Sequence, residues 1–148
     1  LNAALDEAFK ESDNVIIEEF IEGTELSCGI FKAGGKLYPL PPAEIVSKNE
    51  FFDYQAKYDS NYNEEIIPAR IADNLREKCK LITSEIYEVL NCSGIARMDF
   101  ILKDNEIWFL EVNTIPGMTN ESIVPKMIRN AGKSFTEVAD MLIADLIK

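Results

Sequence analysis

The chain is most informative over residues 94–117, which read G-I-A-R-M-D-F-I-L-K-D-N-E-I-W-F-L-E-V-N-T-I-P-G. Two strand-like runs flank a polar break at residues 103–106, a pattern that predicts a β-hairpin. If the turn centres on Asn105, the alternation of side chains along each strand gives the hairpin one apolar face. The residues expected on that face are Met98, Phe100, Leu102, Trp108, Leu110 and Val112.

The opposite face carries polar residues at the end far from the turn, where Asp99 would lie opposite Glu111 and Arg97 opposite Asn113. Two close carboxylates repel each other, and partial burial increases the repulsion. A bound cation would remove it, and an oxygen-only ligand set suits Mg²⁺ better than zinc. Mg²⁺ held by few protein ligands usually shares substrate phosphates, so the pattern indicates a nucleotide site. The alternative is an ordinary half-solvated sheet in which Arg97 pairs with a neighbouring carboxylate.

Composition bounds the class of protein. The 148 residues suffice for one domain with a core, and 47% are hydrophobic. A net charge of -11 opposes binding to nucleic acid or to anionic membranes. The absence of histidine excludes histidine-based catalysis and histidine-bound zinc. Three widely spaced cysteines, no signal peptide and no transmembrane run predict a cytoplasmic protein, and the start without Met suggests a fragment of a longer one.

The predicted elements mix helices with antiparallel hairpins, which indicates an α+β domain. One long helix over 71–91 has an apolar stripe at Leu75, Cys79, Ile82, Ile86, Val89 and Leu90. We also expect an irregular polar loop over 48–65, of a length that is usually functional or mobile. The other predicted helices cover 1–11, 122–130 (ended by Gly132) and 134–147, and the other predicted strands cover 15–20, 25–32, 37–40 and 43–46.

The motif R-x-D-(x11)-E-x-N-T-x-P-G resembles the metal-binding signature of ATP-grasp enzymes. With Gly94 before it and Met118-Thr119 after it, the motif is similar to that of the D-alanine–D-alanine ligase family. Three further segments match this family in order: 15–25 resembles its nucleotide-hinge strand, 51–58 its mobile loop and 120–125 its substrate-carboxylate turn.

The resemblance implies an ATP-grasp C-terminal domain over residues 1–148, with a mixed or antiparallel sheet. The family phosphorylates one D-alanine with ATP, and the amine of a second D-alanine attacks the acyl phosphate. The implied ligands are ATP, D-alanine and two Mg²⁺ ions, for which Mn²⁺ can substitute. The implied roles are nucleotide binding for Glu18, Glu19, Ile21, Glu25 and Lys57, catalysis for Arg97 and Tyr58, metal binding for Asp99, Glu111 (bridging) and Asn113, and substrate binding for Gly117, Ser122 and Ile123.

Elementary chemistry suits these roles but leaves alternatives open. The Glu19 carbonyl and the Ile21 N–H would point to one side of a strand and could pair with adenine, but acidic residues also protect ordinary edge strands. Lys57 and Tyr58 could neutralise phosphates and cap the substrate, or could belong to a solvated loop. Ser122 could begin a carboxylate-binding helix or merely cap it.

Three other functions stay open at this point. The protein could be another ATP-grasp carboxylate–amine ligase, a non-catalytic nucleotide-binding module, or a structural α+β domain that binds a partner. The family's N-terminal substrate domain and phosphate-covering half have no counterpart in these residues. We therefore expect the fragment alone to be inactive, and the parent protein to be a homodimer that binds neither nucleic acid nor membranes.

Overall fold

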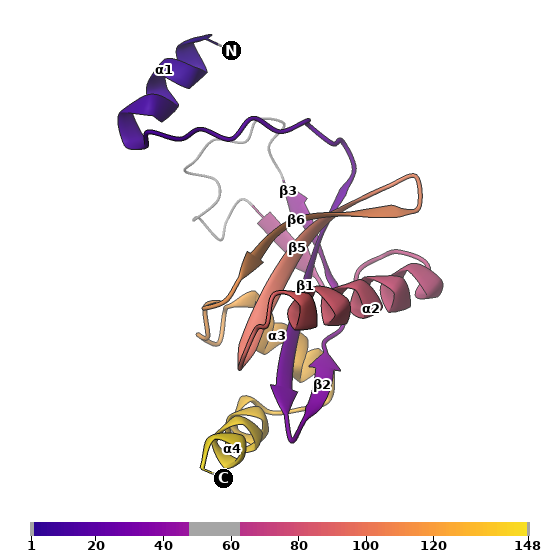
Figure 1. The fold of residues 1–148 in the computed structure, drawn as a ribbon. Helices are drawn as coiled ribbons and strands as arrows, with labels where there is room; N and C mark the ends of the chain where they lie inside the picture. Colours follow the sequence, from indigo (N-terminus) through magenta and orange to yellow (C-terminus); the bar gives the residue numbers. More distant parts are fainter. Residues whose placement is uncertain (1, 48–62, 148) are drawn as a thin grey trace.

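The computed structural model describes residues 2–47 and 63–147, and it has the predicted α+β architecture (Figure 1). None of the helices in this part of the chain is both long and apolar enough to cross a membrane. The elements in chain order are α1 (Asn2–Glu11), β1 (Thr24–Ala33), β2 (Lys36–Pro39), β3 (Ala43–Ser47), β4 (Asn63–Ile66), α2 (Asp73–Val89), β5 (Ile95–Lys103), β6 (Glu106–Asn113), α3 (Ile123–Asn130) and α4 (Phe135–Leu146).

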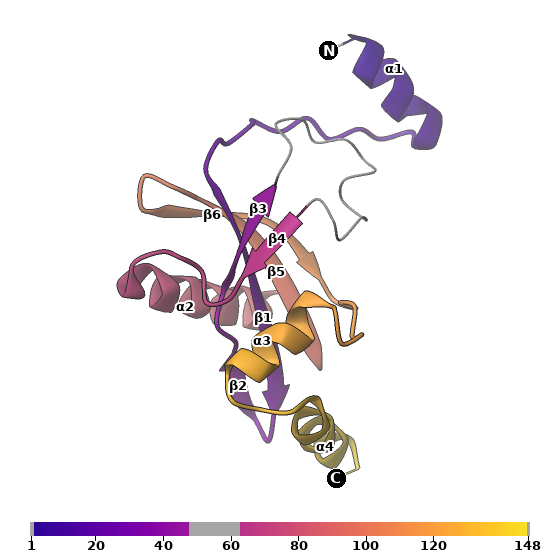
Figure 2. The ribbon, with the colours of Figure 1, turned by 180° about the vertical axis from the view of Figure 1, so that it is seen from behind.

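The strands form one sheet in the order β4-β3-β1-β5-β6, with β2 also paired to β1, and every pairing is antiparallel. Helix α2 covers one face of the sheet, where Cys79 and Tyr87 pack with Met98 and Phe100 of β5. Helices α3 and α4 pack against the other side, as the view from behind shows (Figure 2). The central strands β1 and β5 are therefore covered on both faces, and they form the rigid support of the candidate site.

Helix α2 forms as predicted, but its buried stripe is rotated from the expected one. Val89 and Leu90 are 83% and 48% exposed, whereas Thr83 and Tyr87 are fully buried. Burial of these polar groups is possible because each is hydrogen-bonded: the Thr83 hydroxyl donates to the Cys79 carbonyl and the Tyr87 hydroxyl to the Gly94 carbonyl. A pattern of hydrophobic and polar residues does not predict this stripe, because Thr83 and Tyr87 both carry a hydroxyl group.

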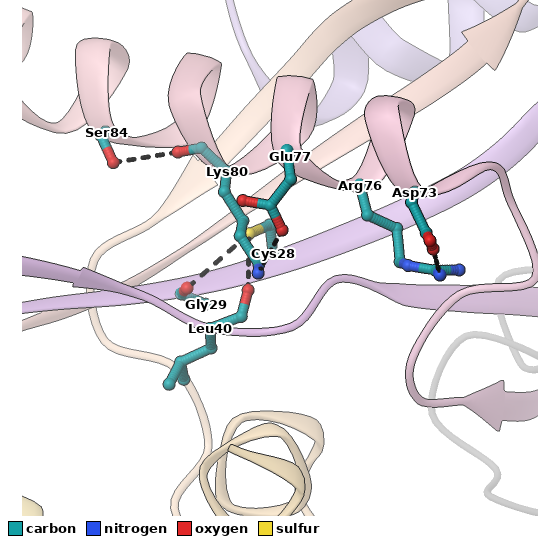
Figure 3. A network of polar contacts seen from close by, with 8 residues as sticks. All are labelled: Cys28, Gly29, Leu40, Asp73, Arg76, Glu77, Lys80 and Ser84. Carbon is teal, nitrogen blue, oxygen red and sulfur yellow. Dashed lines mark hydrogen bonds and ion pairs between the residues drawn. The ribbon is translucent and has the colours of Figure 1, made fainter.

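Polar contacts also hold α2 and β1 in place (Figure 3). Helix α2 carries two ion pairs, Arg76 with Asp73 and Lys80 with Glu77. The two residues of each pair are three positions apart along the helix. The buried Cys28 thiol of β1 lies 3.4 Å from the Leu40 carbonyl, to which it donates. These contacts are local, and none of them involves the predicted nucleotide or metal residues.

Two predictions of local structure are wrong, namely a strand over residues 15–20 and a loop that extends to residue 65. Residues 15–20 form no strand: the backbone is irregular there, and no backbone–backbone hydrogen bond of residues 15–22 is found within the described part of the chain. A strand requires a partner for its backbone groups, and the described residues supply none. Conversely, the end of the expected loop is ordered, because Asn63–Ile66 forms β4 and pairs with β3.

The β5–β6 hairpin is confirmed, but its turn lies half a residue earlier than expected. Lys103 pairs with Glu106 across a two-residue turn, Asp104-Asn105, whose residues have φ values of 52° and 64°. The register changes between Phe100, which pairs with Phe109, and Asp99, which pairs with Glu111. Leu110 is therefore an extra residue in a β-bulge.

The predicted apolar face of the hairpin is wrong for β6, because the observed register places other residues opposite Leu102 and Phe100. Ile107 and Phe109 lie opposite Leu102 and Phe100 on the α2 side, where Trp108 and Leu110 had been expected. Trp108 instead pairs with Ile101, which shares a face with Asp99. Trp108 is 50% exposed and Leu110 is 47% exposed, as expected for side chains that are not in the core.

Candidate functional site

Asp99 is the centre of the candidate site and is only 8% exposed. Arg97 grips it with two hydrogen bonds, from Nε to Oδ1 at 2.9 Å and from Nη2 to Oδ2 at 2.7 Å. Ser27 lies directly opposite on β1, and its hydroxyl donates a hydrogen bond to the same Oδ1. The carboxylate is thus charge-paired and fully oriented within the sheet.

The other two predicted metal ligands lie beside it, in the predicted register. Glu111 pairs with Asp99 and Asn113 pairs with Arg97 across β5 and β6. Asn113 Oδ1 accepts a hydrogen bond of 3.0 Å from the Ile115 N–H, which fixes the amide. Glu111 is exposed, and no ion pair with it is found among the described residues.

The alternative ion pair is also realised, since Arg97 neutralises Asp99. The two interpretations are compatible, because an arginine can balance a carboxylate until a cation arrives. Among the described residues, no group of three Asp, Glu or Cys side chains could hold a metal by itself. Two carboxylates and an amide fit Mg²⁺ only if phosphates or water complete its coordination, which is the usual arrangement for this ion.

The predicted nucleotide residues fall into two groups. Glu25 lies in β1, half-buried and opposite Ile101, on the same face as Ser27 and Asp99. Glu18 and Glu19 are exposed and Ile21 is half-buried, in the irregular segment before β1. The sheet therefore brings Glu25 to the site. Glu18, Glu19 and Ile21 lie outside the strands.

The substrate turn precedes α3. The Ser122 hydroxyl makes no capping bond to the helix, so the simple N-cap alternative is wrong for this side chain. It accepts instead from the Thr119 N–H at 3.1 Å. A Cβ on Gly117 would lie 2.9 Å from Ser122 Oγ, so a side chain at this position would require the hydroxyl to shift. The first N–H groups of α3, at Ile123 and Val124, receive no capping bond from Ser122.

Two site predictions lie outside the described residues: Lys57 and Tyr58. One contributor was missed at first, namely Ser27. The available signal was a hydroxyl two residues after Glu25, on the same face of the strand and between the apolar residues Leu26 and Cys28. Finding its partner required the β1–β5 register, which the sequence does not state.

Comparison with known proteins gives a consistent result. Residues 1–144 match the family described as D-ala D-ala ligase C-terminus. The chain is 44% identical to a D-alanine–D-alanine ligase of Phocaeicola vulgatus over 97% of its own length and 44% of the relative. It is 45% identical to the ligase of Flavobacterium johnsoniae, over 97% of this chain and 46% of that one.

Solved structures agree. The D-alanine–D-alanine ligase of Bacillus anthracis complexed with ATP superposes with a TM-score of 0.79 at 36% identity, covering 97% of this chain and 46% of that one. A D-Ala:D-Ser ligase of Enterococcus faecalis gives 0.82 at 37% identity, covering 97% and 42% respectively. The chain thus spans less than half the length of the relatives it matches.

Proposed function

The chain belongs to the D-alanine–D-alanine ligase family, as the match to the family's C-terminal part shows, and from this premise we propose that the protein carrying it joins two D-alanine molecules at the expense of ATP. Residues 1–148 would make up the C-terminal part of that ligase, with the substrate domain and the phosphate-covering half lying outside them. The observation that carries this proposal is the register that aligns Asp99 with Glu111 and Arg97 with Asn113.

Asp99, Glu111 and Asn113 would hold the Mg²⁺ ions, which would neutralise the triphosphate when bound. Phosphoryl transfer depends mainly on positioning and charge neutralisation, so few protein groups are required. Arg97 would stabilise the transferring phosphoryl group, and the position of its guanidinium beside Asp99 supports this role. To reach a phosphate, Arg97 would have to give up at least one of its two bonds to Asp99.

The adenine would lie farther along the same face, toward the hairpin turn. Trp108 pairs with Ile101 there and is half exposed, so an apolar surface adjoins the carboxylates. A flat purine gains from contact with such a surface. Glu25 would bind the ribose hydroxyls, and the Glu19 carbonyl with the Ile21 N–H would pair with the adenine edge.

The substrate carboxylate would bind at the start of α3. Ile123 and Val124 offer uncapped N–H groups at the positive end of the helix dipole. Gly117 leaves the Ser122 hydroxyl in its place, since a Cβ at this position would lie 2.9 Å from Ser122 Oγ. Lys57 and Tyr58 would cover the site; this role rests on the family resemblance alone.

A second candidate differs in the second substrate. The solved D-Ala:D-Ser ligase superposes about as well as the Bacillus anthracis D-alanine–D-alanine ligase, with TM-scores of 0.82 and 0.80, so the fold does not separate D-alanine from D-serine as the attacking amine. The cytoplasmic location, the homodimer and the lack of nucleic-acid or membrane partners also stay proposals. The net charge of -11 supports the last of these.

The test is a turnover assay of the full-length protein with Mg-ATP, in which phosphate release and product are measured together. Parallel reactions would contain D-alanine alone, D-alanine with D-serine, and D-alanine with D-lactate. We expect phosphate release coupled to D-alanyl-D-alanine. Dominant formation of the serine or lactate product would reassign the second substrate, and ATP binding without turnover on any amino acid would indicate a non-catalytic nucleotide-binding module.

A further inference from the structure

Ser27 is a buried hydroxyl aimed at the predicted metal site. It is 4% exposed, it belongs to the central strand β1, and it pairs across the sheet with Asp99. Its Oγ donates to Asp99 Oδ1. The neighbouring residues of β1, Leu26 and Cys28, are apolar core residues that point to the opposite face. The hydroxyl therefore faces Asp99 rather than the apolar core under α2.

The two oxygens of Asp99 are held differently. Oδ1 accepts two hydrogen bonds, one from Ser27 and one from Arg97 Nε at 2.9 Å. Among the described residues, Oδ2 accepts one, from Arg97 Nη2 at 2.7 Å. If Arg97 swings away toward a phosphate, Oδ2 loses the donor that the described part of the chain gives it, whereas Oδ1 keeps Ser27. The carboxylate then retains its orientation and presents Oδ2 outward.

We propose that Ser27 is a positioning residue that anchors Asp99 Oδ1, so that Oδ2 is presented to the divalent cation when Arg97 is released. This inference rests on the proposed function, in which Asp99 is a metal ligand. Hydrogen bonds to a ligating carboxylate fix its orientation, and removing one typically weakens metal binding or activity by about 10- to 100-fold. A merely structural hydroxyl would affect folding stability but not the affinity for the ion.

The experiment measures the affinity for Mn²⁺ by electron paramagnetic resonance, on the full-length protein with saturating ADP. Thermal unfolding is recorded on the same samples. Ser27→Ala should weaken Mn²⁺ binding by about tenfold. Ser27→Thr keeps a hydroxyl at this position and should restore the affinity to within about threefold of the parent. Ser27→Cys keeps the size with a poorer donor and should also weaken binding, which provides a reading if the alanine variant unfolds.

Ser84→Ala is the matched control. Its hydroxyl is half-buried and donates to the Lys80 carbonyl within α2 (Figure 3). Helix α2 packs on the face of β5 that carries Met98 and Phe100, which is opposite to the face of Asp99. This control should bind Mn²⁺ as the parent does. Unchanged Mn²⁺ affinity in both Ser27→Ala and Ser27→Cys would overturn the positioning role.

Asp99→Asn separates the two proposals. If it loses Mn²⁺ while the Ser27 variants keep it, the metal site stands and the inference about Ser27 falls. If Asp99→Asn binds Mn²⁺ as well as the parent does, the proposed metal site itself is wrong, and the role of Ser27 is overturned with it.

Discussion

The N-terminal segment, residues 2–23, and the sheet body that follows it differ in burial and in strand pairing. In the body, β1 pairs with three strands and is buried along most of its length. In the segment, α1 has no buried residue, and Ile16, Ile17 and Phe20 are 83%, 67% and 83% exposed. Figure 1 shows α1 standing away from the sheet.

The two regions differ in what holds their proposed site residues. The carboxylates and Arg97 are held by the register of the sheet, whereas Glu19 and Ile21 would act through backbone groups that no strand among the described residues engages. Large apolar side chains exposed beside such a backbone indicate a surface for which a partner is needed.

The largest effect is expected on stability. Phe100→Ala removes a fully buried ring between β1 and α2 and should cost about 3–5 kcal/mol of unfolding free energy. Phe20→Ala, on the segment, should change it by less than about 0.5 kcal/mol. Urea unfolding of the 148-residue chain, followed by circular dichroism, measures both. Comparable losses in the two variants would break the distinction between body and segment.

The next effect is on turnover in the full-length protein. Glu111→Gln keeps the shape but removes a metal-binding charge, so kcat should fall by about 10²- to 10³-fold. Glu19→Gln should leave kcat nearly unchanged, because the proposed contact is made by its backbone carbonyl. The same change at the exposed Glu85 of α2 provides the control. Retained activity of Glu111→Gln at saturating Mg²⁺ would show that this carboxylate is not a metal ligand.

A smaller change is expected at Ile21, where proline deletes the N–H proposed to bind adenine. The KM for ATP should rise by about fivefold to tenfold, as the loss of about 1 kcal/mol of hydrogen bonding predicts. The melting temperature of the 148-residue chain should change little, because Ile21 precedes β1 and makes no backbone–backbone hydrogen bond with the described residues. A fall in that temperature would instead place Ile21 in the structural core of the chain.

The smallest effect concerns acid stability of the body. The two side-chain hydrogen bonds from Arg70 lower the pKa of Glu44 below its ordinary value of 4.5. A carboxyl group with a lowered folded-state pKa stabilises the fold above its ordinary pKa, and this contribution is lost as the pH falls through the folded-state value. The free energy of unfolding of Arg70→Met should therefore be lower than that of the parent at neutral pH. The two values should converge as the pH falls below 4.5. Parallel curves over the whole acid range would exclude this linkage.

Much of the body could be predicted from the sequence, because its determinants are local. The alternation around Asp99 and Glu111 predicted the hairpin and both cross-strand pairs. The strand predicted over 15–20 was wrong because a strand depends on a partner that local pattern cannot supply. The placement of Trp108 was wrong because it assumed an unbroken register.

The contribution of Ser27 could not be predicted for a related reason. Ser27 and Asp99 are 72 positions apart, and they meet only because β1 and β5 are adjacent in the sheet. The nucleotide and substrate roles of the site residues stay predictions, since geometry alone does not test them. Ser122 shows how geometry can still narrow a role, because its hydroxyl is turned to Thr119 rather than to the helix.

The extra residue at Leu110 has a consequence for how the hairpin can vary in length. Because Phe109 already faces Phe100 and Glu111 already faces Asp99, deleting Leu110 would leave both pairs matched. It would straighten an edge strand that a bulge bends. The position is therefore a point of tolerance: related chains could gain or lose a residue here, and so adjust the curvature around a base, without exchanging a single charged partner.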